Sequence, residues 1–132
     1  MKKLLILPLL VIASFCFAQD AEEIIGKPIK IGNILVAEND IPEDLNLEDA
    51  KKACQALGKG WRLPTYAEMN IIFKNRDKIG GFEENVYWTS SVLNSNLGVS
   101  LKFWYSSKNS KLGHKGSSQK SFLLYVRAVK FL

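Results

Sequence analysis

The spacing of apolar residues changes once along this chain, and that change constrains the fold more than any other feature. Between residues 47 and 73 apolar side chains recur every three or four positions, as on a helix, whereas beyond residue 85 they alternate, as in strands. Helices followed by several strands predict an α+β domain with a mostly antiparallel sheet. The hydrophobic share of 47% and the charged share of 23% are those of an ordinary globular protein and exclude a disordered or collagen-like chain.

Two helices are predicted, each with its own start signal. The first spans Leu47–Leu57, with Asn46 as N-cap and Gly58 as a left-handed stop. The second begins after Thr65, which can form a capping box with Glu68. The expected buried stripes are Leu47, Ala50, Cys54 and Leu57 on the first helix and Tyr66, Met69, Ile72 and Phe73 on the second.

The remaining elements are predicted as strands and loops. Apolar runs predict strands at Ile29–Val36, Asn85–Val92 and Val99–Tyr105, and Phe122–Phe131 is apolar on both faces, as in a central strand. Residues 106–121 are rich in Ser, Lys, Gly and Asn and are expected to form a polar loop.

The N-terminus has the pattern of a secretory signal. Two lysines precede an apolar run over Leu4–Phe17, which is shorter than a membrane span, and Ala18 fits a cleavage site. A lipid anchor at Cys16 is the alternative, but bulky Phe15 precedes that cysteine. We expect residues 1–18 to be a signal peptide, 19–28 a flexible leader and 29–132 a single domain without a transmembrane segment. The protein is predicted to be exported, to the periplasm or as a secreted or cell-surface protein.

Removal of the signal would leave one cysteine. Cys54 then has no partner within the chain, so the domain is expected to lack disulfides. Because it lies on the apolar stripe of the first helix, we interpret it as a buried structural residue rather than a reactive thiol.

Three short blocks resemble a known family. They are Gly60–Met69 (GWRLPTYAEM), Tyr87–Ser91 (YWTSS) and Tyr125–Lys130 (YVRAVK), and they follow a helix that carries Ala53-Cys54 and Leu57-Gly58. In this order they resemble the bacterial Lcl C-terminal domain family, a domain of unknown function. The resemblance covers about residues 30–132 and implies a C-type-lectin-like fold. We interpret the prominent residues of the blocks as structural: Trp61, Arg62, Leu63, Pro64, Thr65, Glu68, Trp88 and Arg127.

Catalytic and metal-binding signatures are missing. The one histidine, His114, has no acidic residue near it in sequence, and clustered zinc ligands are absent. The Glu-Pro-Asn, Gln-Pro-Asp and Trp-Asn-Asp patterns of calcium-dependent lectins are absent too. Weak binding of a structural calcium by the acidic loop Glu38–Asp44 remains an alternative. We therefore predict no catalytic residue, no metal ligand and no cofactor.

Charge is distributed unevenly. Residues 20–50 hold nine acids and two lysines, whereas residues 85–132 hold seven bases and no acid. The basic half can bind polyanions, or the two halves can attract each other within the domain. For an exported protein, a glycan, an anionic envelope polymer or a protein at the cell envelope is the expected partner, and nucleic acid is not.

The predicted ligand-binding surface lies on and after the strand Val99–Tyr105. Alternation places Val99, Leu101, Phe103 and Tyr105 on the core side. It leaves Trp104 on the polar side with Ser100 and Lys102, unless the sheet is covered on both faces. The candidate binding residues are Lys102, Trp104, Lys108, Lys111, His114 and Lys115. These features favour a non-enzymatic recognition module; the alternatives are a small envelope enzyme, an enzyme inhibitor or a structural accessory subunit.

Overall fold

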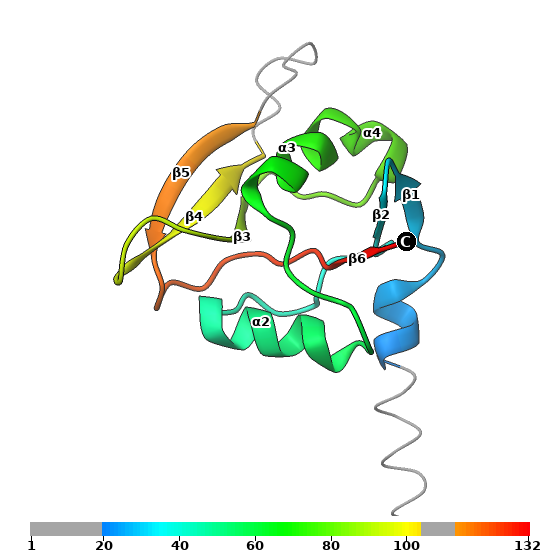
Figure 1. Cartoon of the computed structure of the whole chain (residues 1–132), viewed down its shortest axis with the longest axis horizontal. Helices are drawn as coiled ribbons and strands as arrows, with labels where there is room; N and C mark the ends of the chain where they lie inside the picture. Colours follow the sequence, from blue (N-terminus) through cyan, green and yellow to red (C-terminus); the bar gives the residue numbers. More distant parts are fainter. Residues whose placement is uncertain (1–19, 104–112) are drawn as a thin grey trace, which may run out of the picture.

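A computed structural model describes residues 20–103 and 113–132 of the chain (Figure 1). The elements in chain order are β1 (Ile29–Ile31), β2 (Ile34–Val36), α2 (Leu47–Ala56), α3 (Tyr66–Lys74), α4 (Arg76–Ile79), β3 (Val86–Val92), β4 (Leu97–Lys102), β5 (His114–Gln119) and β6 (Val129–Phe131). The strands form two antiparallel sheets, ordered β1-β2-β6 and β3-β4-β5. The predicted α+β architecture is confirmed, with two small sheets in place of one.

The two predicted helices form with the predicted caps. The side chain of Asn46 accepts a hydrogen bond from the backbone N–H of Asp49 at the start of α2. At the start of α3, Thr65 and Glu68 form the complete capping box. Local sequence signals therefore set both helix starts.

The predicted strand over Ile29–Val36 is a hairpin instead. β1 and β2 pair around a two-residue turn, Gly32-Asn33, in which Gly32 has a φ of +60°. A glycine with positive φ at the first turn position is what a type II′ hairpin turn uses. The Gly-Asn pair thus turns the chain, so what reads as one interrupted strand is two.

The polar segment before residue 122 contains a strand that hydrophobic patterning does not reveal. β5 has no apolar side chain, yet each of its residues is paired with β4, from Leu97↔Gln119 to Lys102↔His114. Backbone hydrogen bonds to β4 form this edge strand, and alternation does not detect a strand without an apolar face. The prediction of a loop throughout residues 106–121 is therefore wrong for β5.

The last segment is less regular than the single central strand predicted for Phe122–Phe131. Only Val129–Phe131 forms a strand, whereas Leu124 and Tyr125 make isolated bridges to Leu45 and Tyr87. The segment runs between α2 and α3 and joins the two sheets (Figure 1). The segment pairs with several partners in turn, and it is buried from Val126 to Val129, whereas Phe122, Leu123 and Phe131 at its ends are exposed.

Residues 20–25 form a helix where a flexible leader was predicted for residues 19–28. Ala21, Ile24 and Ile25 pack against the core, and the carbonyls of Ile24 and Ile25 accept hydrogen bonds from the backbone of Asn39 and Glu38. This apolar face and its satisfied carbonyls hold the segment in place. Within residues 20–103 and 113–132, no helix has the length and apolar character to cross a membrane.

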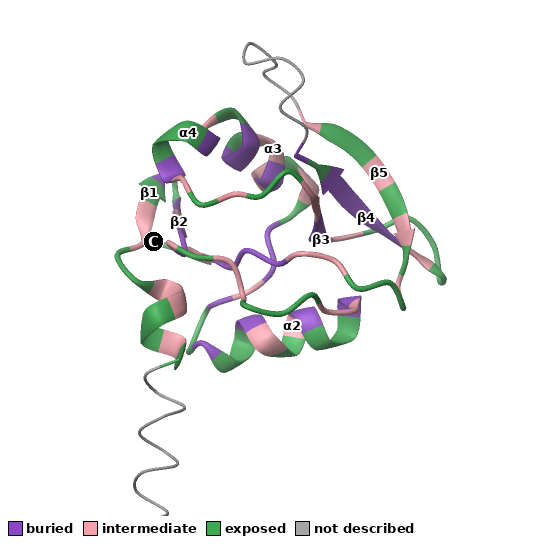
Figure 2. Ribbon diagram, turned by 180° about the vertical axis from the view of Figure 1, so that it is seen from behind, coloured by how far each residue is buried: buried purple, intermediate pink, exposed green. Residues whose placement is uncertain are grey.

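The core consists of two clusters of buried side chains, and Figure 2 shows which segments of the chain are buried. One packs α3 against β3 and β4 around Phe73, Phe103 and Leu101, and the other packs α2 around Cys54 and Trp88. Cys54 is fully buried, and burial raises the pKa of its thiol to about 12. It is a free cysteine, and it is held as an uncharged, inert thiol at neutral pH.

Arg127 is fully buried and connects separate parts of the chain. Its Nε donates to Asp40 Oδ1 at 2.7 Å, and its two terminal nitrogens donate to the carbonyl oxygens of Ala37, Gly80 and Gly81 at 3.0–3.2 Å. A buried guanidinium with this set of acceptors has its charge compensated and most of its donors satisfied. The last segment is thereby tied to the end of β2 and to the turn after α4.

Removal of the carboxylate should destabilise the fold strongly. We predict that Asp40→Asn lowers the free energy of unfolding by about 3 kcal/mol, because the substitution leaves the buried charge of Arg127 uncompensated. Chemical denaturation measures this loss, with Asp44→Asn, an exposed acid of the same loop, as control. A loss below about 1 kcal/mol in Asp40→Asn would show that the ion pair is not needed for stability.

Candidate functional site

Three of the predicted binding residues meet at one end of the β4–β5 ladder. Lys102 and His114 lie opposite each other across the two strands, and Lys115 lies opposite Leu101. All three side chains of the predicted set are exposed. Trp104, Lys108 and Lys111, the other predicted members, lie outside the described residues. The end of the ladder therefore presents Lys102 and His114 on one face and Lys115 on the other face, which is that of Leu101.

Tyr66 adds an aromatic ring to this surface. The Nζ atom of Lys115 lies 4.8 Å from the centroid of the Tyr66 ring, within the range of a cation–π contact. Tyr66 and Lys115 on this face, with Lys102 and His114 on the opposite face of the same ladder end, are together called the β4–β5 site below. The apolar spacing of the second helix predicts only that Tyr66 lies on its buried stripe. The ring is in fact half-buried, as suits an aromatic residue at the first position of a helix.

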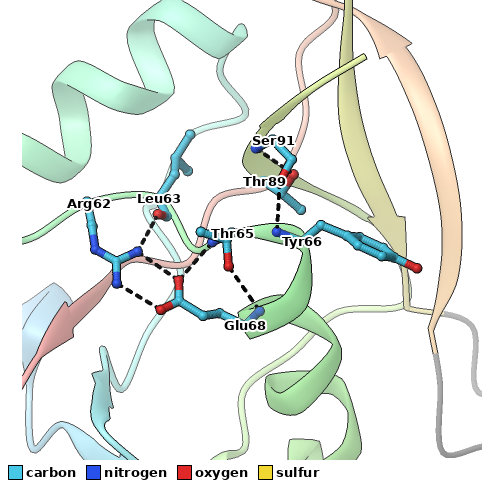
Figure 3. A network of polar contacts seen from close by, with 7 residues as sticks. All are labelled: Arg62, Leu63, Thr65, Tyr66, Glu68, Thr89 and Ser91. Carbon is cyan, nitrogen blue, oxygen red and sulfur yellow. Dashed lines mark hydrogen bonds and ion pairs between the residues drawn. The ribbon is translucent and has the colours of Figure 1, made fainter.

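A chain of hydrogen bonds fixes the position of Tyr66 (Figure 3). Its backbone N–H donates to Ser91 Oγ at 3.0 Å, and the backbone N–H of Ser91 donates to Thr89 Oγ1 at 3.2 Å. The Thr89 hydroxyl in turn donates to the Val99 carbonyl at 2.8 Å. The start of α3 is thus attached to β3 and, through it, to β4.

A second set of contacts holds the chain just before Tyr66 (Figure 3). Arg62 binds both oxygens of Glu68, at 2.7 and 2.8 Å, and also donates to the Leu63 carbonyl. Glu68 Oε1 accepts from the Thr65 backbone N–H as well, at 2.9 Å. The hydrogen bonds from Arg62 lower the pKa of Glu68, with a smaller contribution from Thr65. The charged form of Glu68 is therefore the form that the fold stabilises.

The polar face of β4 is only partly open. Val99, Leu101 and Phe103 are buried, as alternation predicts, but Ser100 on the opposite face is buried as well, with its hydroxyl 3.2 Å from that of Ser118. The sheet is thus covered on both faces at Ser100. Only toward Lys102 does the polar face reach the surface.

The residues interpreted as structural lie in the interior or in hydrogen-bond networks. Trp61, Leu63, Pro64 and Trp88 are buried, and the indole N–H of Trp88 donates to the Leu45 carbonyl at 2.7 Å. The other members of this set are Cys54, Arg62, Thr65, Glu68 and Arg127, whose contacts are given above. None of them belongs to the β4–β5 site.

The acidic loop contributes one carboxylate to the interior. Asp40 Oδ1 accepts from Arg127 and Oδ2 accepts from the Tyr87 hydroxyl, both at 2.7 Å. Burial raises the pKa of Asp40, although Arg127 and Tyr87 both act to lower it. Among residues 20–103 and 113–132, no three His, Cys, Asp or Glu side chains are grouped closely enough to hold a metal ion. Both oxygens of Asp40 are engaged by the hydrogen bonds from Arg127 and Tyr87.

Comparison with known proteins identifies the fold. No family model matches the chain, and no curated protein matches it in sequence. Among solved structures, the chain is similar to EMS16, an antagonist of the collagen receptor integrin α2β1, with a TM-score of 0.58 and 8% identity. The match covers 80% of this chain and 97% of EMS16. The protein has a C-type-lectin-like fold, as the resemblance of the sequence blocks implied.

The ion pair at the base of α3 should give the stability a defined pH dependence. Because the pKa of Glu68 is lower in the folded protein than its ordinary value of 4.5, its contribution is present above that value and is lost as the pH falls through the lowered pKa. We predict that Glu68→Gln is less stable than the natural chain at pH 7 and that this difference shrinks below pH 4.5.

Denaturation at a series of pH values measures the difference. Glu48→Gln, an exposed acid in the first turn of α2, is the matched control. A deficit in Glu68→Gln that stays constant down to strongly acidic pH would contradict a lowered pKa.

Proposed function

We propose that this protein is a non-enzymatic recognition module that binds an acidic glycan through the β4–β5 site. The observation that supports this most directly is the ammonium group of Lys115 over the ring of Tyr66. The ammonium of Lys115 covers a face of this half-buried ring, so the C–H face of a sugar would take its place on the ring, and the displaced ammonium would pair with the carboxylate or sulfate of the same sugar. The pair therefore combines the two interactions that an acidic sugar needs.

The surrounding charges favour an anionic ligand. Residues 85–132, which contain β3, β4, β5 and β6, include no acidic side chain, so Lys102 and Lys115 have no carboxylate neighbour within this part of the sequence. Arg127, another base of this segment, forms an ion pair with Asp40 in the interior. The exposed cations at the end of the ladder attract anions over about one Debye length, which is about 8 Å at physiological salt.

Preorganisation supports binding at this place. The hydrogen bonds from the Tyr66 backbone to Ser91 and from the Ser91 backbone to Thr89 hold the backbone of Tyr66 to the sheet before any ligand arrives. A ring that is already positioned loses little conformational entropy on binding. Lys115 is likewise fixed at the backbone by its pairing with β4.

The character of the ionisable groups supports recognition rather than catalysis. His114 faces Lys102 across the ladder, so its cross-strand neighbour is a cation rather than the carboxylate that would orient an imidazole as a base. Asp40 accepts hydrogen bonds from both Tyr87 and Arg127 in the interior. EMS16, which is similar in fold, is an antagonist of a receptor, so that protein uses this fold for recognition.

Export is part of the proposal. The lysine-led apolar run ending at Ala18 supports removal of residues 1–18 and delivery to the periplasm or cell surface, where acidic glycans and envelope polymers occur. The same compartment would also place the recognition site in contact with proteins of the envelope.

Substitutions in the β4–β5 site should reduce binding without unfolding the protein. With polygalacturonate as probe and neutral dextran as control, we predict that Lys115→Glu weakens binding by about tenfold. Tyr66→Leu should weaken it by a similar factor, whereas Tyr66→Phe should bind nearly as the natural chain does, because the ring provides the contact. Isothermal titration at low and physiological salt measures the affinities.

The matched control is Lys78→Glu, which reverses an exposed charge on α4. If Lys78→Glu and Lys115→Glu lose affinity equally, the effect is one of net charge and the assignment to the β4–β5 site is wrong. If the natural chain does not bind polygalacturonate at all, the acidic-glycan proposal is wrong.

A further inference from the structure

An apolar groove lies on the side of the molecule formed by the helix over residues 20–25, the loop after β2 and α2. Its floor is made by Ile24, Ile41, Ala53 and Leu57. The apolar part has a volume of about 210 Å³, which is enough for one aliphatic side chain. It is continuous with a wider hollow that shares Ile24, Ile41 and Ala53.

The walls of the groove are fixed by backbone contacts. The Ile41 N–H donates to the Val126 carbonyl at 2.9 Å, and Leu45 exchanges two backbone hydrogen bonds with Leu124. On the opposite wall, the end of the short helix is held by the backbone N–H groups of Glu38 and Asn39. The groove is thus a formed feature of the fold between anchored elements.

The rim of the groove is acidic. Asp20, Glu23, Glu43 and Asp49 line the wider hollow, all are exposed, and they come from the short helix, the loop and the start of α2. Among residues 20–103 and 113–132, no basic side chain lines either hollow. An apolar floor below a rim of one charge sign complements a ligand that carries an aliphatic group between charges of the opposite sign.

We propose that this groove binds a cationic segment of a partner protein, with one aliphatic side chain in the apolar hollow and flanking Lys or Arg side chains on the rim. A soluble polyamine would satisfy the rim but leave the floor uncovered, whereas an uncharged apolar segment would leave the carboxylates unpaired. Only a segment with both features uses the whole groove. The site is separate from the β4–β5 site in both position and charge, so its test does not depend on the proposed glycan function.

The test uses a short capped peptide of leucines flanked by lysines, titrated into the purified chain and followed by calorimetry and by backbone NMR. The expected result is binding that shifts the resonances of Ile24, Ile41 and Ala53 and weakens as salt is added. Replacement of the leucines by serine should weaken binding about tenfold or more, because the apolar contact is lost. Replacement of the lysines by glutamate should abolish it.

Variants of the protein locate the interaction. Glu23→Gln combined with Glu43→Gln should weaken binding of the leucine–lysine peptide, whereas Glu48→Gln combined with Asp77→Asn, which removes two exposed acids outside the groove, should leave it nearly unchanged. Circular dichroism verifies that both double variants are folded.

Three outcomes would overturn the proposal. Equal binding of the serine and leucine peptides would show attraction to acidic side chains without use of the apolar floor. Equal losses in the two double variants would show an effect of net charge. Self-association of the chain that Glu23→Gln with Glu43→Gln abolishes would assign the groove to a second copy rather than to a foreign partner.

Discussion

The buried guanidinium of Arg127 is the interaction on which the rest of this structure depends. It binds the carboxylate of Asp40 and three carbonyl oxygens, and these come from the end of the β1–β2 hairpin and from the turn that precedes β3. That turn requires Gly81, which has a φ of +76°, and a Cβ atom there would lie 3.2 Å from the Arg127 side chain. Without disulfides, this charged cluster does what a covalent cross-link does in many small exported domains: it joins segments far apart in sequence.

The cluster also orients the sheet that carries the β4–β5 site. Asp40 accepts a hydrogen bond from Tyr87 on β3, and burial, reinforced by this carboxylate, raises the pKa of the Tyr87 hydroxyl, so that it remains a donor. β3 pairs with β4, β4 pairs with β5, and β3 also holds α3 through Ser91. The ring of Tyr66 and the ammonium of Lys115 therefore meet because α3 and β5 are attached to the same sheet, α3 at β3 and β5 at β4. This is why a half-buried tyrosine and a lysine on a polar edge strand can form a site.

Local signals in the sequence predict part of this picture. Asn46, Thr65 and Glu68 mark the helix starts because caps act over three residues, and the buried side of β4 follows from alternation. β5 could not be found in this way, since it has no apolar face, and the helix over residues 20–25 depends on contacts with distant backbone. For the site, the uneven distribution of charge indicates the basic residues Lys102 and Lys115. The contact between Lys115 and Tyr66 joins positions 49 residues apart, and the periodicity of apolar residues does not predict such a contact.

The most direct test of the account is chemical-shift mapping of the chain with oligogalacturonate. We predict that the backbone resonances of Tyr66 and Lys115 shift together with one saturation curve, while those around Ala53 in the apolar groove stay unchanged. A ligand-dependent shift confined to other parts of the surface, or none at ligand concentrations that saturate weak glycan sites, would contradict the assignment of recognition to the β4–β5 site.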